Sequence, residues 1–160
     1  MINLGRYSGA DLPNVRIQPR LLDWVMEAIS VLVWISLLCI TFLYRQEISG
    51  MGGGKNFILP GISTLITLLF LWSARAPIRY FNFPVRVTER NYVTQLILAV
   101  RFCRVVSIQL NITFLLRFLA DCVVQDEVVK RYLHGCSATL IVLLLVSFII
   151  YFLIARRYPA

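Results

Sequence analysis

The stretch that decides the fold is SATLIVLLLVSFIIYFLIA, residues 137–155, which carries no charge and is followed directly by Arg156 and Arg157. A helix of about 18 or more apolar residues, rising ~1.5 Å per residue, can cross the hydrocarbon core of a bilayer, which is ~30 Å thick. A second long run covers residues 21–44, where Asp23 and Glu27 near its start are the only charges. Both runs are predicted to span a membrane.

Two further runs complete the expected set of spans. Residues 57–74 form a shorter apolar run with a proline and a glycine near its start. A helical pattern from residue 88 to 120 contains several arginines and is longer than a bilayer requires. We expect residues 105–119 to cross and the helical extension from residue 88 to stand in the cytoplasm, although an interfacial or soluble helix is an alternative. The sequence therefore predicts an all-α, integral membrane four-helix bundle.

Composition supports the same fold class. The chain has 160 residues, of which 59% are hydrophobic and 15% charged, and its mean hydropathy is +0.76. Ordinary soluble chains have about a quarter charged residues. This composition excludes most soluble enzymes, and it excludes disorder because so much apolar surface cannot stay solvated. No connecting segment is long enough for a second domain, so residues 1–160 are predicted to form one multi-pass domain. Residues 1–20 contain no apolar stretch, so the first span is expected to direct membrane targeting.

The distribution of cations predicts an orientation. Net charge is +8, and the Lys and Arg residues lie at or near the ends of apolar runs, where lipid head groups attract them. This placement favours the bilayer over nucleic acid as the partner. Eleven of the 16 cations fall on one side: Arg6, Arg16, Arg20, Arg75, Arg79, Arg86, Arg90, Arg101, Arg104, Arg156 and Arg157. By the positive-inside bias, both termini and the central linker are cytoplasmic, an N-in/C-in arrangement.

Charged residues near the span ends are candidates for ion pairs. Asp23 and Glu27 lie one helical turn apart, and Arg101 and Arg104 share a face at about the same depth. A charge near lipid needs a partner, so we expect these four to pair, with proton or cation transfer by the two carboxylates as the alternative.

At the other end of the third span, Arg117 has Asp121 four residues on, and we expect this pair as well. In mid-span, Asn111 is expected to hydrogen-bond to a neighbouring helix.

The last connecting loop carries three further predictions. Residues 126–132 contain two acid-before-base pairs at helical spacing, which indicates a short amphipathic helix on the outer membrane surface, or alternatively a receptor surface for an external peptide. Cys122 and Cys136 flank the loop, so a disulfide is permitted if that side is oxidising. No grouping of residues supports catalysis, a metal site or a cofactor, and the sequence predicts a non-enzymatic protein.

Three segments carry a resemblance to a known family. They are PRLLDWVMEAISVLVW from residue 19, the turn G-x-G-G-G-K-N-F-x-L-P from residue 50, and FNFPVRVTERNYVTQLILAVRFCRVV from residue 81. Over residues 19–119 the chain resembles the bacterial membrane domain of unknown function that forms the amino-terminal part of SdpI-type immunity proteins. The most specific motif matches at Phe81, Asn82, Phe83, Pro84, Val85, Val87, Thr88 and Asn91.

The resemblance implies a helical multi-pass protein of the bacterial inner membrane. Members related to SdpI are linked to immunity against, and signalling from, a secreted toxic peptide. The His-containing segment usual in the family's first outer loop is missing here. The motif itself is interpreted as a structural elbow in which Thr88 caps the third helix, with a partner-binding site as the alternative.

The preferred hypothesis is a non-enzymatic immunity or signalling protein that meets a secreted peptide or a membrane protein. An accessory subunit of a larger membrane complex is the second hypothesis and a small transporter the third.

Overall fold

The computed structural model describes residues 19–46, 57–76, 80, 81, 83, 85, 87 and 91–157. Within these ranges the chain forms four long α-helices: α1 (Leu21–Leu43), α3 (Ile58–Ser73), α4 (Tyr92–Phe118) and α5 (Glu127–Arg156). A five-residue π-helical turn, η3 (Leu119–Val123), continues α4. No strand occurs in the described ranges, so the all-α prediction is confirmed for them.

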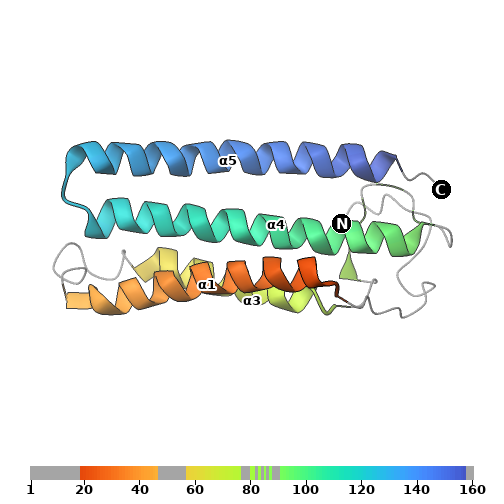
Figure 1. Cartoon of the computed structure of the whole chain (residues 1–160), viewed down its shortest axis with the longest axis horizontal. Coiled ribbons are helices and arrows are strands. Elements are labelled where there is room, and N and C mark those ends of the chain that lie inside the picture. The colour runs from red at the N-terminus through yellow and green to blue at the C-terminus, as the bar shows by residue number, and fades with distance from the viewer. Residues whose placement is uncertain are drawn as a thin grey trace.

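Helix α4 is the centre of the bundle. Every other helix packs against it, and Figure 1 shows α5 on one side of α4 with α1 and α3 on the other. The beginnings of α1 and α4 lie at the same end as the finishes of α3 and α5 (Figure 1). We call this the arginine end, because Arg20, Arg75, Arg101, Arg104, Arg156 and Arg157 all lie there.

Three helical segments are long and apolar enough to cross a membrane: residues 21–43, residues 92–123 with the π turn included, and residues 127–156. Helix α3 has 16 residues and a length of about 24 Å, short of a hydrocarbon core of ~30 Å. It occupies the predicted second span, 57–74. Helix α4 begins at Tyr92, after Asn91 as N-cap, whereas the sequence predicted a start at Thr88, which lies outside the described residues.

The predicted surface helix over residues 126–132 is wrong. These residues form the first turns of α5, which runs without interruption to Arg156. Asp126 caps the helix, because its Oδ1 accepts hydrogen bonds from the backbone N–H groups of Val128 at 2.7 Å and Val129 at 3.2 Å. Lys130 consequently pairs with Glu127, at 3.0 Å, and not with Asp126.

The bundle buries many polar side chains together with apolar ones, and its exterior is largely apolar. The buried residues of α1 are Asp23, Ser30, Leu37 and Thr41, and those of α3 are Pro60, Ser63 and Thr67. The exposed positions are filled by large apolar side chains, for example Leu32 at 63% and Leu65 at 70% exposure. Soluble proteins rarely display a continuous apolar surface of this kind.

Helix α5 is the most exposed element. Only Ser137, Tyr151 and Ala155 are buried on it, and Tyr151 and Ala155 lie at the seam with α4. At that seam the Tyr151 ring stacks on Phe102, with centroids 4.4 Å apart, and Gln109 Nε2 donates to Ser147 Oγ at 3.0 Å. Helix α5 is therefore held by α4 and η3 and leaves the rest of its circumference uncovered.

Candidate functional site

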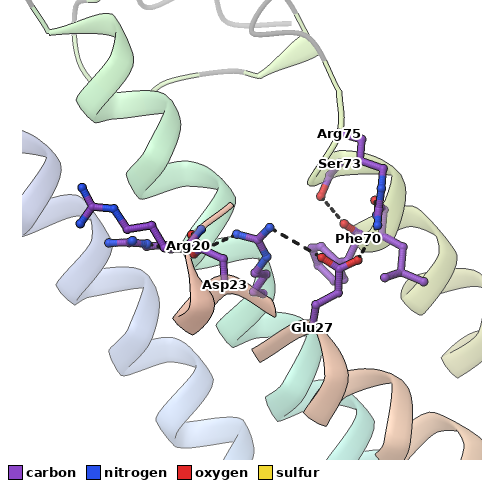
Figure 2. A network of polar contacts seen from close by, with 9 residues as sticks. Arg20, Asp23, Glu27, Phe70, Ser73 and Arg75 are labelled. Atoms are coloured by element: carbon purple, nitrogen blue, oxygen red, sulfur yellow. Dashed lines mark hydrogen bonds and ion pairs between the residues drawn. The ribbon is translucent and has the colours of Figure 1, made fainter. Parts of the chain in front are cut away.

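Five charged side chains form an alternating ladder at the arginine end (Figure 2). Asp23 Oδ1 accepts Arg101 Nε and Arg104 Nη1, each at 3.1 Å. Glu27 lies next along α1, with Oε2 at 3.6 Å from Arg104 Nη2 and Oε1 at 2.9 Å from Arg75 Nη2. The structure thus brings together all four residues that the sequence paired, and it adds Arg75.

Local helix geometry explains the ladder. Asp23 and Glu27 are four residues apart on α1, and Arg101 and Arg104 are three apart on α4, so each pair lies on one helix face. Asp23 Oδ2 also accepts the backbone N–H of Arg20 at 2.9 Å, which fixes the first turn of α1. A carboxylate in that turn is favoured by the helix dipole.

Burial differs along the ladder. The Asp23 side chain is 4% exposed and that of Arg104 9%, whereas the side chains of Arg101 and Arg75 are 34% and 60% exposed. Removing one partner of a buried pair strands the other charge, at a cost of about 3–5 kcal/mol. Within the ladder, the Asp23–Arg104 contact is therefore the one whose loss is expected to cost most.

Sequence reasoning missed Arg75 by placing it in the basic linker. It lies two residues beyond the end of α3, and its Nη1 donates to Leu71 O at 2.9 Å, so it closes the last turn of that helix. Figure 2 shows it above Glu27 from the α3 side. The order of the helices could have indicated this contact. Helix α3 runs antiparallel to α1, so a residue just after α3 lies at the same end of the bundle as the first turns of α1.

A second polar layer lies in the middle of the bundle, around Asn111. The Asn111 side chain is fully buried, and its Oδ1 accepts Ser63 Oγ at 2.9 Å and Thr67 Oγ1 at 3.2 Å. Its Nδ2 lies 3.1 Å from Ser30 Oγ and 3.0 Å from Thr67 Oγ1. Ser30 in turn meets Ser107 at 2.7 Å. This confirms that Asn111 bonds to neighbouring helices, and the layer joins α1, α3 and α4.

At the opposite end, Asp121 connects α4 to α5 through η3. Arg117 Nε lies 3.8 Å from Asp121 Oδ2, which brings together the predicted pair. His134 Nε2 of α5 lies 3.4 Å from Asp121 Oδ1, a contact that the sequence analysis did not anticipate. The π-helical turn carries Asp121, and such turns displace a side chain from regular α-helical register.

The family-motif residues that the structure describes pack against the start of α4. Phe83 and Val87 are buried in a cluster with Leu96, Ala99, Val100 and Tyr151. Phe81 packs at its edge, and Asn91 is buried as the N-cap of α4. Asn82, Pro84 and Thr88 lie outside the described residues. In the described part, these side chains attach the connection to both α4 and α5.

The disulfide between Cys122 and Cys136 is not formed, and both cysteines are free. Cys122 is buried in the π turn, in a cluster with Leu37 and Phe118. Cys136 is exposed on α5. The two thiols therefore occupy different environments, and spacing along the loop was an insufficient guide to a bond.

The described residues contain no group of three His, Cys, Asp or Glu side chains that could hold a metal ion. The carboxylates of the ladder are bonded to arginines, and the hydroxyls and amide of the central layer are bonded to one another. The chemistry these sites display is helix association. Comparison with protein-family models, curated proteins and solved structures found no match for this chain.

Proposed function

We propose that the chain is a multi-pass protein of the bacterial inner membrane whose four helices all cross the bilayer. The apolar exterior, with polar side chains buried between the helices, supports this placement, because lipid accepts an apolar exterior and water does not. Helix α3 is short, but a short helix is accommodated by local thinning of the bilayer. The ion pairs and the Asn111 layer then satisfy the polar groups away from lipid.

The arginine end is proposed to face the cytoplasm. Among the described residues it carries six arginines and two carboxylates, whereas the opposite end carries four cations and three carboxylates. Cytoplasmic loops are enriched in Lys and Arg. Both termini are then inside, and residues 47–56 and the α4–α5 connection are outside.

We further propose that this protein has an immunity or signalling role of the SdpI type and is not an enzyme. Helix α5 packs on α4 and η3 with one side only. Its opposite, apolar face is uncovered, and this observation carries the proposal. Ile141, Leu145 and Ile149 on that face are exposed by 51%, 60% and 59%. A hydrophobic peptide or a partner helix in the membrane binds to a face of this kind by side-chain packing. The resemblance of residues 19–119 supports the assignment.

A mixed culture tests the immunity role. A strain lacking the gene is grown beside its parent, whose secreted products supply the toxic peptide, and then with a plasmid copy of the gene. The deletion strain is expected to be outgrown, and the plasmid is expected to restore it. Ile149→Trp should restore growth poorly at equal membrane abundance, whereas the matched variant Leu32→Trp, on the exposed side of α1, should restore it fully. Equal growth of parent and deletion strain would refute the immunity role.

An accessory subunit of a larger membrane complex is the second candidate, and the same face of α5 favours it. A lasting partner would then remain bound to the tagged protein during purification in mild detergent. A transporter is disfavoured, because the mid-bundle polar groups are closed against one another and fully buried at Asn111 and Ser63. An alternating-access site would instead place unwound backbone or an acid at that depth.

A further inference from the structure

The arginine end carries more positive charge than its own carboxylates can neutralise. In the described part of the chain, this end has six arginines and two carboxylates, Asp23 and Glu27, which leaves an excess of four positive charges. Gln95 Nε2 donates to Ala155 O at 3.0 Å, so the last turn of α5, with Arg156, is fixed against the start of α4. Surplus cations at the edge of a hydrocarbon layer attract anionic groups.

Asp23 is already bonded to three donors. Its two oxygens already accept the Arg20 backbone N–H at 2.9 Å and the guanidinium groups of Arg101 and Arg104 at 3.1 Å each. The residue is also 3% exposed, so it cannot turn toward another partner. Among the described residues, Asp23 and Glu27 are the carboxylates at this end, and both are already bonded to arginines.

Arg101 is anchored and also partly accessible. It binds Asp23 through Nε, the inner nitrogen of the guanidinium, and its side chain is 34% exposed, against 9% for Arg104. A guanidinium has five N–H donors in a planar fork, so the Nε contact leaves the terminal nitrogens as donors. A fork whose plane is fixed on one side is well suited to bind phosphate oxygens on the other.

Arg20 is the second cation at this corner. Its backbone N–H and Arg101 Nε bind the same carboxylate, so the two residues are joined through Asp23, and Arg20 is exposed. The neighbouring side chains are apolar: Leu21 is 82%, Leu22 57% and Trp24 53% exposed. An exposed tryptophan beside arginines is typical of the membrane–water interface.

We propose that Arg101 and Arg20 bind a phosphate group, and that this phosphate belongs to an anionic phospholipid. The exposed apolar side chains beside the two arginines favour a lipid over free phosphate, because they provide a surface for acyl chains. The inference rests on the membrane placement proposed above, but not on the immunity role.

Native mass spectrometry of the purified protein tests the site. The protein in detergent is titrated with phosphatidylglycerol, and the affinity of the first bound lipid is measured for the wild type, Arg101→Gln, Arg101→Lys and Arg117→Gln. Arg117 is the matched control, because it is an exposed arginine that pairs with an acid at the opposite end. Arg101→Gln should weaken binding about tenfold, because charge-assisted hydrogen bonds are lost. The affinity of Arg101→Lys should lie between those of the wild type and Arg101→Gln, because lysine keeps the positive charge but lacks the planar guanidinium. Arg117→Gln should stay within about twofold of the wild type.

Folding is checked by elution volume and helix content in detergent. Arg101→Gln leaves Asp23 paired with Arg104 and should fold. If Arg101→Gln does not fold, Arg20→Gln provides a second test. Arg20 bonds to Asp23 through its backbone N–H, so this substitution leaves that bond in place. Arg20→Gln should weaken lipid binding about threefold.

Three results would overturn the inference. The first is wild-type affinity in both Arg101→Gln and Arg20→Gln. The second is an equal loss in Arg117→Gln, which would indicate a general effect of charge. The third is displacement of the lipid by inorganic phosphate at equal concentration, which would assign the site to a soluble anion. The mixed-culture assay does not measure lipid binding. If the protein protects cells but shows one of these three results in mass spectrometry, the lipid site is refuted and the immunity role is not.

Discussion

Neutralising Asp23, Glu27 and Asp121 in turn should destabilise the bundle in an order set by their burial. In Asp23→Asn, the side chain keeps its shape but loses its charge, and the 9%-exposed Arg104 retains only Glu27 at 3.6 Å. Breaking a buried pair costs about 3–5 kcal/mol. We expect Asp23→Asn to lower the free energy of unfolding by about 3 kcal/mol, the low end of this range, because Glu27 still offers partial compensation.

The two other carboxylates provide graded comparisons. Glu27 is 13% exposed and shares one contact with the 60%-exposed Arg75, so Glu27→Gln should cost about 1–2 kcal/mol, between the surface and buried cases. Asp121 is 45% exposed, and Asp121→Asn should cost about 0.2–1 kcal/mol, as exposed pairs do.

Reversible unfolding in bicelles, for example by steric trapping, measures these differences directly. The controls are equal expression of the three variants and equal helix content before unfolding. A cost for Asp23→Asn no larger than that for Asp121→Asn would refute the argument that the ladder holds α1 to α4. A gain in stability would do the same.

Three further predictions concern the centre, the α5 seam and the orientation. Asn111→Ala removes the bonds that link three helices and should cost about 2 kcal/mol in the same unfolding assay. Interhelical bonds average about 0.6 kcal/mol each, and the buried hydroxyls also lose their partner. The control Ser36→Ala, whose hydroxyl bonds only within α1, should cost almost nothing, and a similar loss in both variants would contradict the prediction. A double-mutant cycle of Phe102→Leu and Tyr151→Leu should give a coupling of about 1 kcal/mol from the stacked rings, whereas additive effects would show that the stack contributes nothing. Arg86→Cys, in a variant without exposed native cysteines, should resist a membrane-impermeant thiol reagent in intact cells and react after lysis; labelling in intact cells would reverse the proposed orientation.

Periodicity and charge placement anticipated much of this architecture. The runs at residues 21–44 and 137–155 and the pairing of Asp23 and Glu27 with Arg101 and Arg104 depend on local pattern and helix faces, which the sequence displays directly. The membership of Arg75 in the ladder and of His134 in the Asp121 contact depends on how separate helices align, and local pattern does not contain that information.

The wrong prediction of a separate helix in the α4–α5 connection has a similar origin. The charge spacing over residues 126–132 predicted a separate surface helix. Asp126 is instead the N-cap of α5, and that helix continues through the apolar run to Arg156. The π-helical turn at residues 119–123 changes the direction of Cys122, so distance along the chain could not decide whether it meets Cys136.

The attachment of α5 along one side has a consequence for how the protein assembles. Helices α1, α3 and α4 share the Asn111 layer and the ion ladder, so these three can associate with their polar groups satisfied before the last helix arrives. Helix α5 adds mainly apolar contacts and a few polar ones along one seam. It is thus the part of the molecule that can separate from the others, or exchange for another transmembrane segment, at the smallest cost to the interior.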